Sequence, residues 1–115
     1  MHHFTYSTVV AEGPAVARAG EREVILRSIE LMEAAEHAGP GSREVVDAVY
    51  FINRLWCHMI EDLGSQDNNL PKELRAKLIS IGLYLMRRAN EVREAEGGSF
   101  RGMINISQTI ADGLK

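Results

Sequence analysis

The sequence predicts an all-α fold, a compact bundle of about four helices with a short N-terminal arm. No window alternates apolar and polar residues with period two for long, so strand signals are nearly absent. Four segments instead repeat apolar residues every three or four positions, and glycine or proline separates them. At 115 residues we expect a single domain over 1–115, with residues 1–13 as the arm. Short loops favour antiparallel neighbouring helices.

The first helix is predicted from Pro14 to about His37. Proline suits a first helical position because its missing N–H would have no partner there. Gly39 is a natural C-terminal stop, and Pro40 prevents continuation. The apolar stripe of this helix is Val24, Ile25, Ile29 and Met32, with Leu31 and Ala35 on its edge.

The second helix is predicted from the N-cap Ser42 to about Leu63, and it is the most apolar segment. Its main stripe follows one helical face: Val45, Val49, Ile52, Trp56, Met59 and Leu63. The stripe is widened by Val46, Leu55 and Ile60, and extended on both sides by Tyr50 and Phe51. An apolar arc this wide predicts a central helix with neighbours on several sides, and it predicts Trp56 in the core.

The third helix is predicted from near Pro71 to about Glu94 and carries two apolar stripes. The first stripe is predicted to face the core: Leu74, Leu78, Ile81, Leu85 and Val92. The second stripe lies roughly opposite and is either core or interface: Ile79, Leu83 and Met86. A last helix is predicted from Phe100 to about Leu114, after Gly97-Gly98 and a capping Ser99, with Met103, Ile106, Ile110 and Leu114 as its apolar positions.

Composition indicates a cytoplasmic protein without affinity for membranes or nucleic acid. The net charge is −3 and the pI is about 5.8, so nothing draws the protein to anionic polymers or lipid. The lone Cys57 cannot form an internal disulfide, which fits a reducing compartment. The N-terminal sequence lacks the basic segment and following apolar run of a signal peptide, so none is expected. Every apolar run is shorter than the ~20 residues that span a bilayer.

The sequence favours neither catalysis nor a metal or cofactor site. No pair of soft ligands has the helical spacing that places two on one face; the candidates are His2, His3, His37, Cys57 and His58. Glu61 and Asp62 are adjacent and do not face each other, so a polar contact with the following loop suits them better. No nucleophile motif is present, and we therefore expect no enzyme.

A basic cluster, Arg87-Arg88 with Arg93, lies near the end of the third helix. There it offsets the negative end of the helix dipole. Acidic residues are interleaved with it, and base-stacking aromatics are not expected beside it. This pattern does not favour nucleic-acid binding.

The chain has more apolar helical surface than a small domain can cover, which predicts a protein-binding surface. Methionine adapts to irregular partners, and a short apolar patch beside a groove suits recognition of a helix. The candidate binding residues are Ile79, Leu83, Met86, Tyr50 and Phe51. Self-association through this surface is left open by the sequence.

Several short motifs follow one another along the chain. They are Asn53-Arg54-Leu55-Trp56, Ile60-Glu61-Asp62-Leu63, the block from Asn69-Leu70-Pro71 through Leu74-Arg75-Ala76 to Leu78-Ile79-Ser80-Ile81-Gly82-Leu83, and Ile104-Asn105-Ile106 with Ile110-Ala111-Asp112-Gly113-Leu114. Tyr6 and the region from Arg18 to Arg22 fit more loosely. With these motifs the chain resembles the flagellar biosynthesis regulator FlaF family of alphaproteobacteria over nearly its whole length.

The resemblance implies a small cytoplasmic protein that acts on flagellin, the filament subunit. It implies binding of the amphipathic terminal helices of flagellin before export, much as the chaperone FliS does, with FlbT as a companion regulator. The resemblance does not distinguish whether the synthesis, the stability or the export of flagellin is regulated. The alternative is a post-transcriptional regulator that acts on flagellin messenger RNA, directly or with FlbT.

Overall fold

Four helices make up the computed structural model of this protein, which describes residues 14–95 and 98–114. They are α2 (Pro14–Ala38), α3 (Arg43–Leu63), α4 (Lys72–Ala95) and α5 (Arg101–Gly113). No strand occurs in these residues, which confirms the predicted all-α class. Each helix boundary agrees with the sequence prediction to within a residue or two. The predicted N-terminal arm, residues 1–13, lies outside the described residues.

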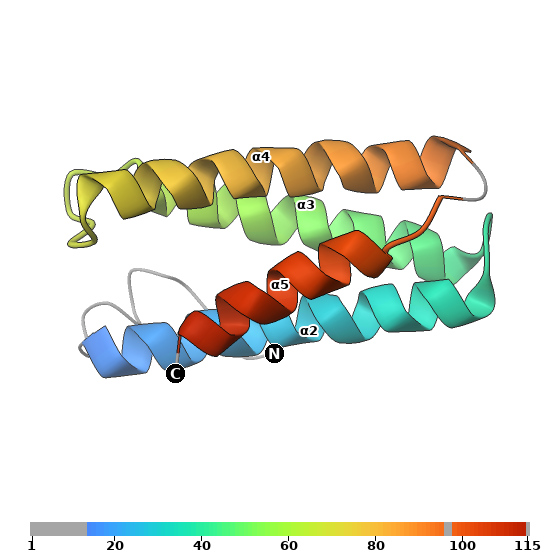
Figure 1. The fold of residues 1–115 in the computed structure, drawn as a ribbon, viewed down its shortest axis with the longest axis horizontal. Coiled ribbons are helices and arrows are strands. Elements are labelled where there is room, and N and C mark those ends of the chain that lie inside the picture. Colours follow the sequence, from blue (N-terminus) through green and yellow to red (C-terminus); the bar gives the residue numbers. More distant parts are fainter. Residues whose placement is uncertain (1–13, 96–97, 115) are drawn as a thin grey trace.

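The helices are arranged so that α2 and α3 each pack against two others. Close backbone approaches join α3 to α4, α2 to α3, and α2 to α5. Figure 1 shows α4 running alongside α3, while the short α5 crosses α2 diagonally and moves away from α4 along its length. The prediction that α3 is contacted on more than one side is therefore confirmed, and α2 shares this central position.

The turn between α2 and α3 is built as the sequence predicts. Gly39 has a φ of 93° and its N–H donates to the carbonyl of Ala35 at 3.0 Å, which ends α2 in a left-handed residue. Gly41 has a φ of 77°, a second position that glycine adopts without strain. Ser42 then caps α3, since its hydroxyl accepts a hydrogen bond from the backbone N–H of Val45 at 3.3 Å.

The main stripe of α3 forms the centre of the core. All six residues of this stripe are buried: Val45, Val49, Ile52, Trp56, Met59 and Leu63. Leu55 is buried as well. Trp56 is 1% exposed, as predicted for a core residue. Its indole ring packs against Gly82 of α4 so closely that a Cβ at this position would overlap the ring. The contact between α3 and α4 therefore depends on a glycine facing a tryptophan.

Burial along the core-facing stripe of α4 decreases toward its N-terminus, and here the prediction was wrong in part. Val92 and Leu85 are 5% and 1% exposed, Ile81 and Leu78 are half-buried, and Leu74 is 41% exposed. The reason is that the 13-residue α5 is much shorter than the 24-residue α4 and diverges from it (Figure 1).

The prediction was also wrong for Val46. This side chain was expected to widen the apolar face of α3, yet it is 52% exposed. The reason is that Val46 lies about 100° around α3 from the buried Val45, outside the arc that packs on the core.

Candidate protein-binding surface

Apolar side chains line the sides of α3 and α4 that meet where Cys57 approaches Met86. We call this set of residues the outer face and define it as Val46, Tyr50 and Cys57 of α3 with Ile79, Leu83 and Met86 of α4. Because an α-helix advances about 100° per residue, each set of three falls on one stripe of its own helix. The two stripes meet where the Cys57 thiol lies 3.9 Å from the Met86 sulfur.

Half of the outer face is strongly exposed. Tyr50 is 62% exposed, and Val46 and Leu83 are each 52% exposed. Ile79 and Met86 are partly buried, and Met86 also packs against the core. Large apolar side chains this exposed on two neighbouring helices are the kind of feature that marks an interaction site.

The structure therefore places four of the five predicted binding residues on one surface. Tyr50, Ile79, Leu83 and Met86 all lie on the outer face. Phe51 follows Tyr50 by one residue, about 100° around α3, and it packs against the core instead. The prediction took both aromatic residues because it followed the width of the apolar arc without knowing which flank α4 leaves open.

Charged groups border the outer face on α3. Arg54 donates to the Tyr50 hydroxyl at 3.1 Å, and its guanidinium carbon lies 5.7 Å from the centre of that ring. Glu61 lies two turns further along the same helix, and both charges are exposed. Neither has an ion-pair partner within residues 14–95 and 98–114.

The expectation that no aromatic lies beside the basic cluster of α4 was wrong. The Arg87 guanidinium carbon lies 5.7 Å from the centre of the Tyr84 ring, which is 41% exposed. Tyr84 precedes Arg87 by three residues, a spacing that brings two side chains together on a helix. The neighbouring Arg88 is partly neutralised by Glu91, with a separation of 3.4 Å between their charged atoms.

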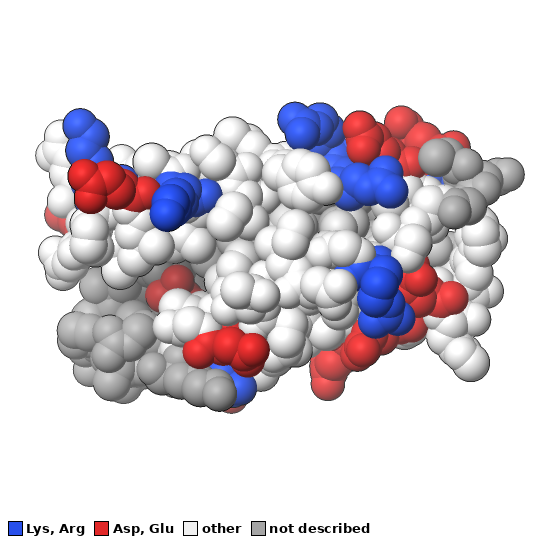
Figure 2. All heavy atoms as spheres, in the orientation of Figure 1, with Lys and Arg blue, Asp and Glu red and all other residues white. Residues whose placement is uncertain are grey.

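A second set of apolar side chains lies along α4 and α5, and we call it the region between α4 and α5. Its members are Leu74, which is exposed, and the half-buried Leu78, Ile81, Ile106, Ile110 and Leu114. Figure 2 shows the side on which α5 lies, where an uncharged band crosses the middle of the surface and charged groups gather toward its ends. Sequence patterning assigned the α4 residues to the core because the stripe itself gives no sign of where its partner helix ends.

Polar contacts fasten the loop between α3 and α4. Asn68 donates its amide to the Asp62 carboxylate at 2.9 Å, which confirms the predicted polar contact with this loop. Burial raises the pKa of Asp62, the hydrogen bond from Asn68 opposes that rise, and the nearby charge of Asp67 adds to it. Arg75 of α4 also donates to the carbonyl of Leu63 at 3.4 Å. These bonds fix the register of α4 against α3, and so the alignment of the outer face.

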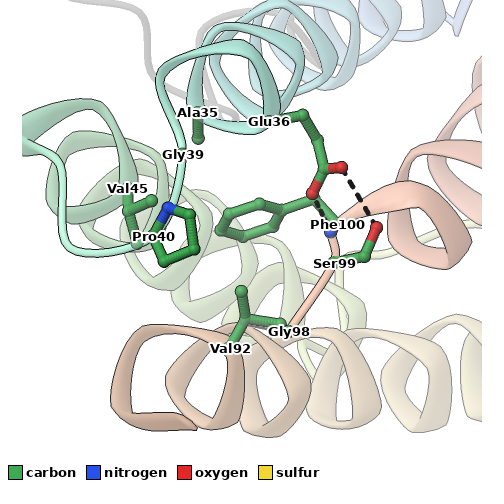
Figure 3. A pocket seen from close by; sticks show the side chains of 9 residues that line it. All are labelled: Ala35, Glu36, Gly39, Pro40, Val45, Val92, Gly98, Ser99 and Phe100. Atoms are coloured by element: carbon green, nitrogen blue, oxygen red, sulfur yellow. Dashed lines mark hydrogen bonds between the residues drawn. The ribbon is translucent and has the colours of Figure 1, made fainter. Parts of the chain in front are cut away.

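A hollow of about 190 Å³ lies at one end of the bundle, where α2, α3 and α4 meet the start of α5. Phe100 extends into it and is only 1% exposed (Figure 3). The Glu36 carboxylate of α2 accepts hydrogen bonds from the Phe100 N–H and the Ser99 hydroxyl (Figure 3). Ser99 in turn accepts from the N–H of Arg101 at 3.0 Å. The prediction that Ser99 caps α5 was wrong by one residue, because the N-cap is Phe100, whose side chain makes no capping hydrogen bond.

Two further features of the described residues bear on function. No three His, Cys, Asp or Glu side chains among them come together in a way that would hold a metal ion. None of the four helices is both long and apolar enough to cross a membrane.

The structure is that of a small all-helical protein with exposed apolar side chains on two adjacent helices. The profile of the family described as Flagellar protein FlaF matches residues 2–114. This chain belongs to the FlaF family of flagellar proteins. No curated protein and no solved structure matches it.

Proposed function

We propose that this flagellar protein binds flagellin in the cytoplasm through the outer face and regulates its synthesis, stability or export. The observation that carries the proposal is the exposure of Tyr50 and Val46 on α3 and of Leu83 on the neighbouring α4. The flagellar family supplies the client, since flagellin has amphipathic terminal helices that assemble into the filament. An apolar seam between two helices suits the apolar face of such a helix.

The mechanism is mass action. Each flagellin terminal helix that lies on the outer face is withdrawn from the pool available for premature assembly. Because bound and folded states are linked, the same contact also stabilises the bound protein in proportion to the client concentration. Met86 and the Cys57 thiol give the surface soft side chains that adapt to different helical partners.

The first test is co-purification of flagellin with this protein and with the variant Leu83→Asp. Leu83 is half-exposed, so a carboxylate there removes apolar contact area and adds a charge without disturbing the core. We expect flagellin binding to weaken about tenfold or more, with unchanged helical content by circular dichroism.

Leu74→Asp is the matched control, because Leu74 is an exposed leucine of the same helix on the α5 side. Loss of binding in Leu74→Asp with full binding in Leu83→Asp would move the client to the region between α4 and α5. Full binding in both variants would refute a role for either surface.

The second candidate is contact with flagellin messenger RNA, directly or with FlbT. It is favoured by the two exposed tyrosine–arginine pairs, Tyr50 with Arg54 and Tyr84 with Arg87, because aromatic and guanidinium planes stack on unpaired bases. The net charge of −3 opposes it. A gel shift with flagellin leader RNA that weakens steeply with salt and is lost in Tyr84→Ala would support this candidate over the first.

A further inference from the structure

We propose that the outer face also pairs with the outer face of a second copy of this chain, as a two-fold symmetric dimer with Cys57 beside the axis. This goes beyond flagellin binding, because it concerns the purified protein alone. Two-fold interfaces use the same patch on both subunits, so a surface that forms one must complement itself. The outer face meets this condition in the arrangement of its charges.

The apolar part supplies the centre of the interface. Cys57 and Met86 are in contact where the two helices meet. Leu83 precedes Met86 by about one turn of α4. Val46 and Tyr50 extend the apolar stripe along α3. Cys57, Leu83 and Met86 give the interface an uncharged centre, and methionine is enriched at such centres.

The charges on α3 make the pairing specific. Arg54 lies three residues before Cys57, and Glu61 lies four residues after it. Within one chain they are about 10 Å apart along the helix, too far to pair with each other. A two-fold axis beside Cys57 reverses the second copy of α3, so Arg54 of each copy faces Glu61 of the other. Two ion pairs then form from four charges that have no ion-pair partner within the described parts of the chain.

Arg54 is already positioned for this contact. Its hydrogen bond to Tyr50 and its place over the tyrosine ring restrict the side chain before association. Restricting a long side chain in advance lowers the entropy that is lost when it binds.

The side of α3 and α4 that carries the outer face has an area of about 600 Å², at the lower end of the range for specific dimers. Helices of more than 20 residues, packed side by side, present a face about 30 Å long and about 20 Å wide. A standard interface buries about 800 Å² on each partner, roughly a ninth of the 7166 Å² that this protein exposes.

The test exploits charge complementarity between variants. Arg54→Glu and Glu61→Arg each place like charges at both symmetric contacts, so we expect each to raise the dimer dissociation constant about tenfold or more in sedimentation experiments. An equimolar mixture of the two variants should form a heterodimer, because every contact then joins opposite charges. Glu33→Arg on the exposed side of α2 is the control and should dimerise like the unchanged protein.

A chemical measurement checks the position of the axis. A short bis-maleimide should join two copies of the unchanged protein through Cys57, and the joined product should fall in Arg54→Glu. Labelling by a monofunctional maleimide must stay equal in both, which shows that the thiol itself has not changed. A protein that remains monomeric at every concentration overturns the proposal. So does a dimer whose formation is unaffected by both charge reversals, or variants that fail to recover on mixing.

Discussion

At the scale of single residues, the packing of α3 on α4 depends on Gly82. The Trp56 indole occupies the space in which any other residue would place its Cβ. We predict that Gly82→Ala lowers the free energy of unfolding by about 1–3 kcal/mol, because the cost of overpacking exceeds the gain in helix propensity. Urea unfolding followed by the fluorescence of Trp56 measures this change.

Gly102→Ala is the matched control for that prediction. Gly102 is also helical, but no heavy atom lies within 4 Å of a Cβ built there. This variant should gain up to about 1 kcal/mol from alanine's higher helix propensity alone. Equal effects of the two substitutions would contradict the close approach of α4 to Trp56.

At the scale of elements, α5 is held at its start by a residue of another helix. Glu36 accepts two hydrogen bonds from the segment that begins α5, and its negative charge lies at the positive end of the α5 dipole. We predict that Glu36→Ala costs about 1–2 kcal/mol of stability and Glu36→Gln costs less, because glutamine keeps one acceptor oxygen.

Hydrogen exchange localises the effect of Glu36. Amide protection should fall mainly in α5, since this helix contacts α2 and little else closely. Glu33→Ala, an exposed glutamate one turn earlier on α2, should leave α5 protected. A uniform loss of protection across all four helices would argue against separate docking of α5.

The elements themselves could be predicted because their causes are local. Ser42, Gly39 and the stripe through Trp56 follow from capping, backbone freedom and helical periodicity, and these act within a few residues. The exposure of Leu74 could not be predicted in the same way, because it depends on where α5 stops covering α4. The bond from Glu36 to Phe100 joins residues 64 positions apart, and periodicity carries no information about such pairs.

The outer face could be predicted only in part from the sequence. The second stripe of α4 was visible in the sequence, and a small bundle leaves few ways to cover both sides of one helix. Which residues of α3 complete the surface depended on the flank that α4 leaves free. Tyr50 is exposed whereas Phe51, about 100° further around α3, packs against the core.

At the scale of the whole molecule, the two proposals meet on one surface and therefore compete. A copy of this protein and a flagellin helix cannot both cover the outer face, so dimerisation lowers the fraction of protein that is competent to bind flagellin. The apparent dissociation constant for the client equals the intrinsic constant divided by that fraction. We predict that the apparent constant of the unchanged protein for a flagellin terminal peptide rises with protein concentration, while that of the monomeric Glu61→Arg does not.

Titration by fluorescence anisotropy at two protein concentrations, one below and one above the dimer dissociation constant, measures this difference. The double variant Arg54→Glu with Glu61→Arg restores opposite charges across the interface and should recover the concentration dependence. Sedimentation of the mixture should show one client bound to one copy of the protein. A stable complex of two copies with a client would instead place flagellin away from the outer face, with the region between α4 and α5 as its remaining apolar surface.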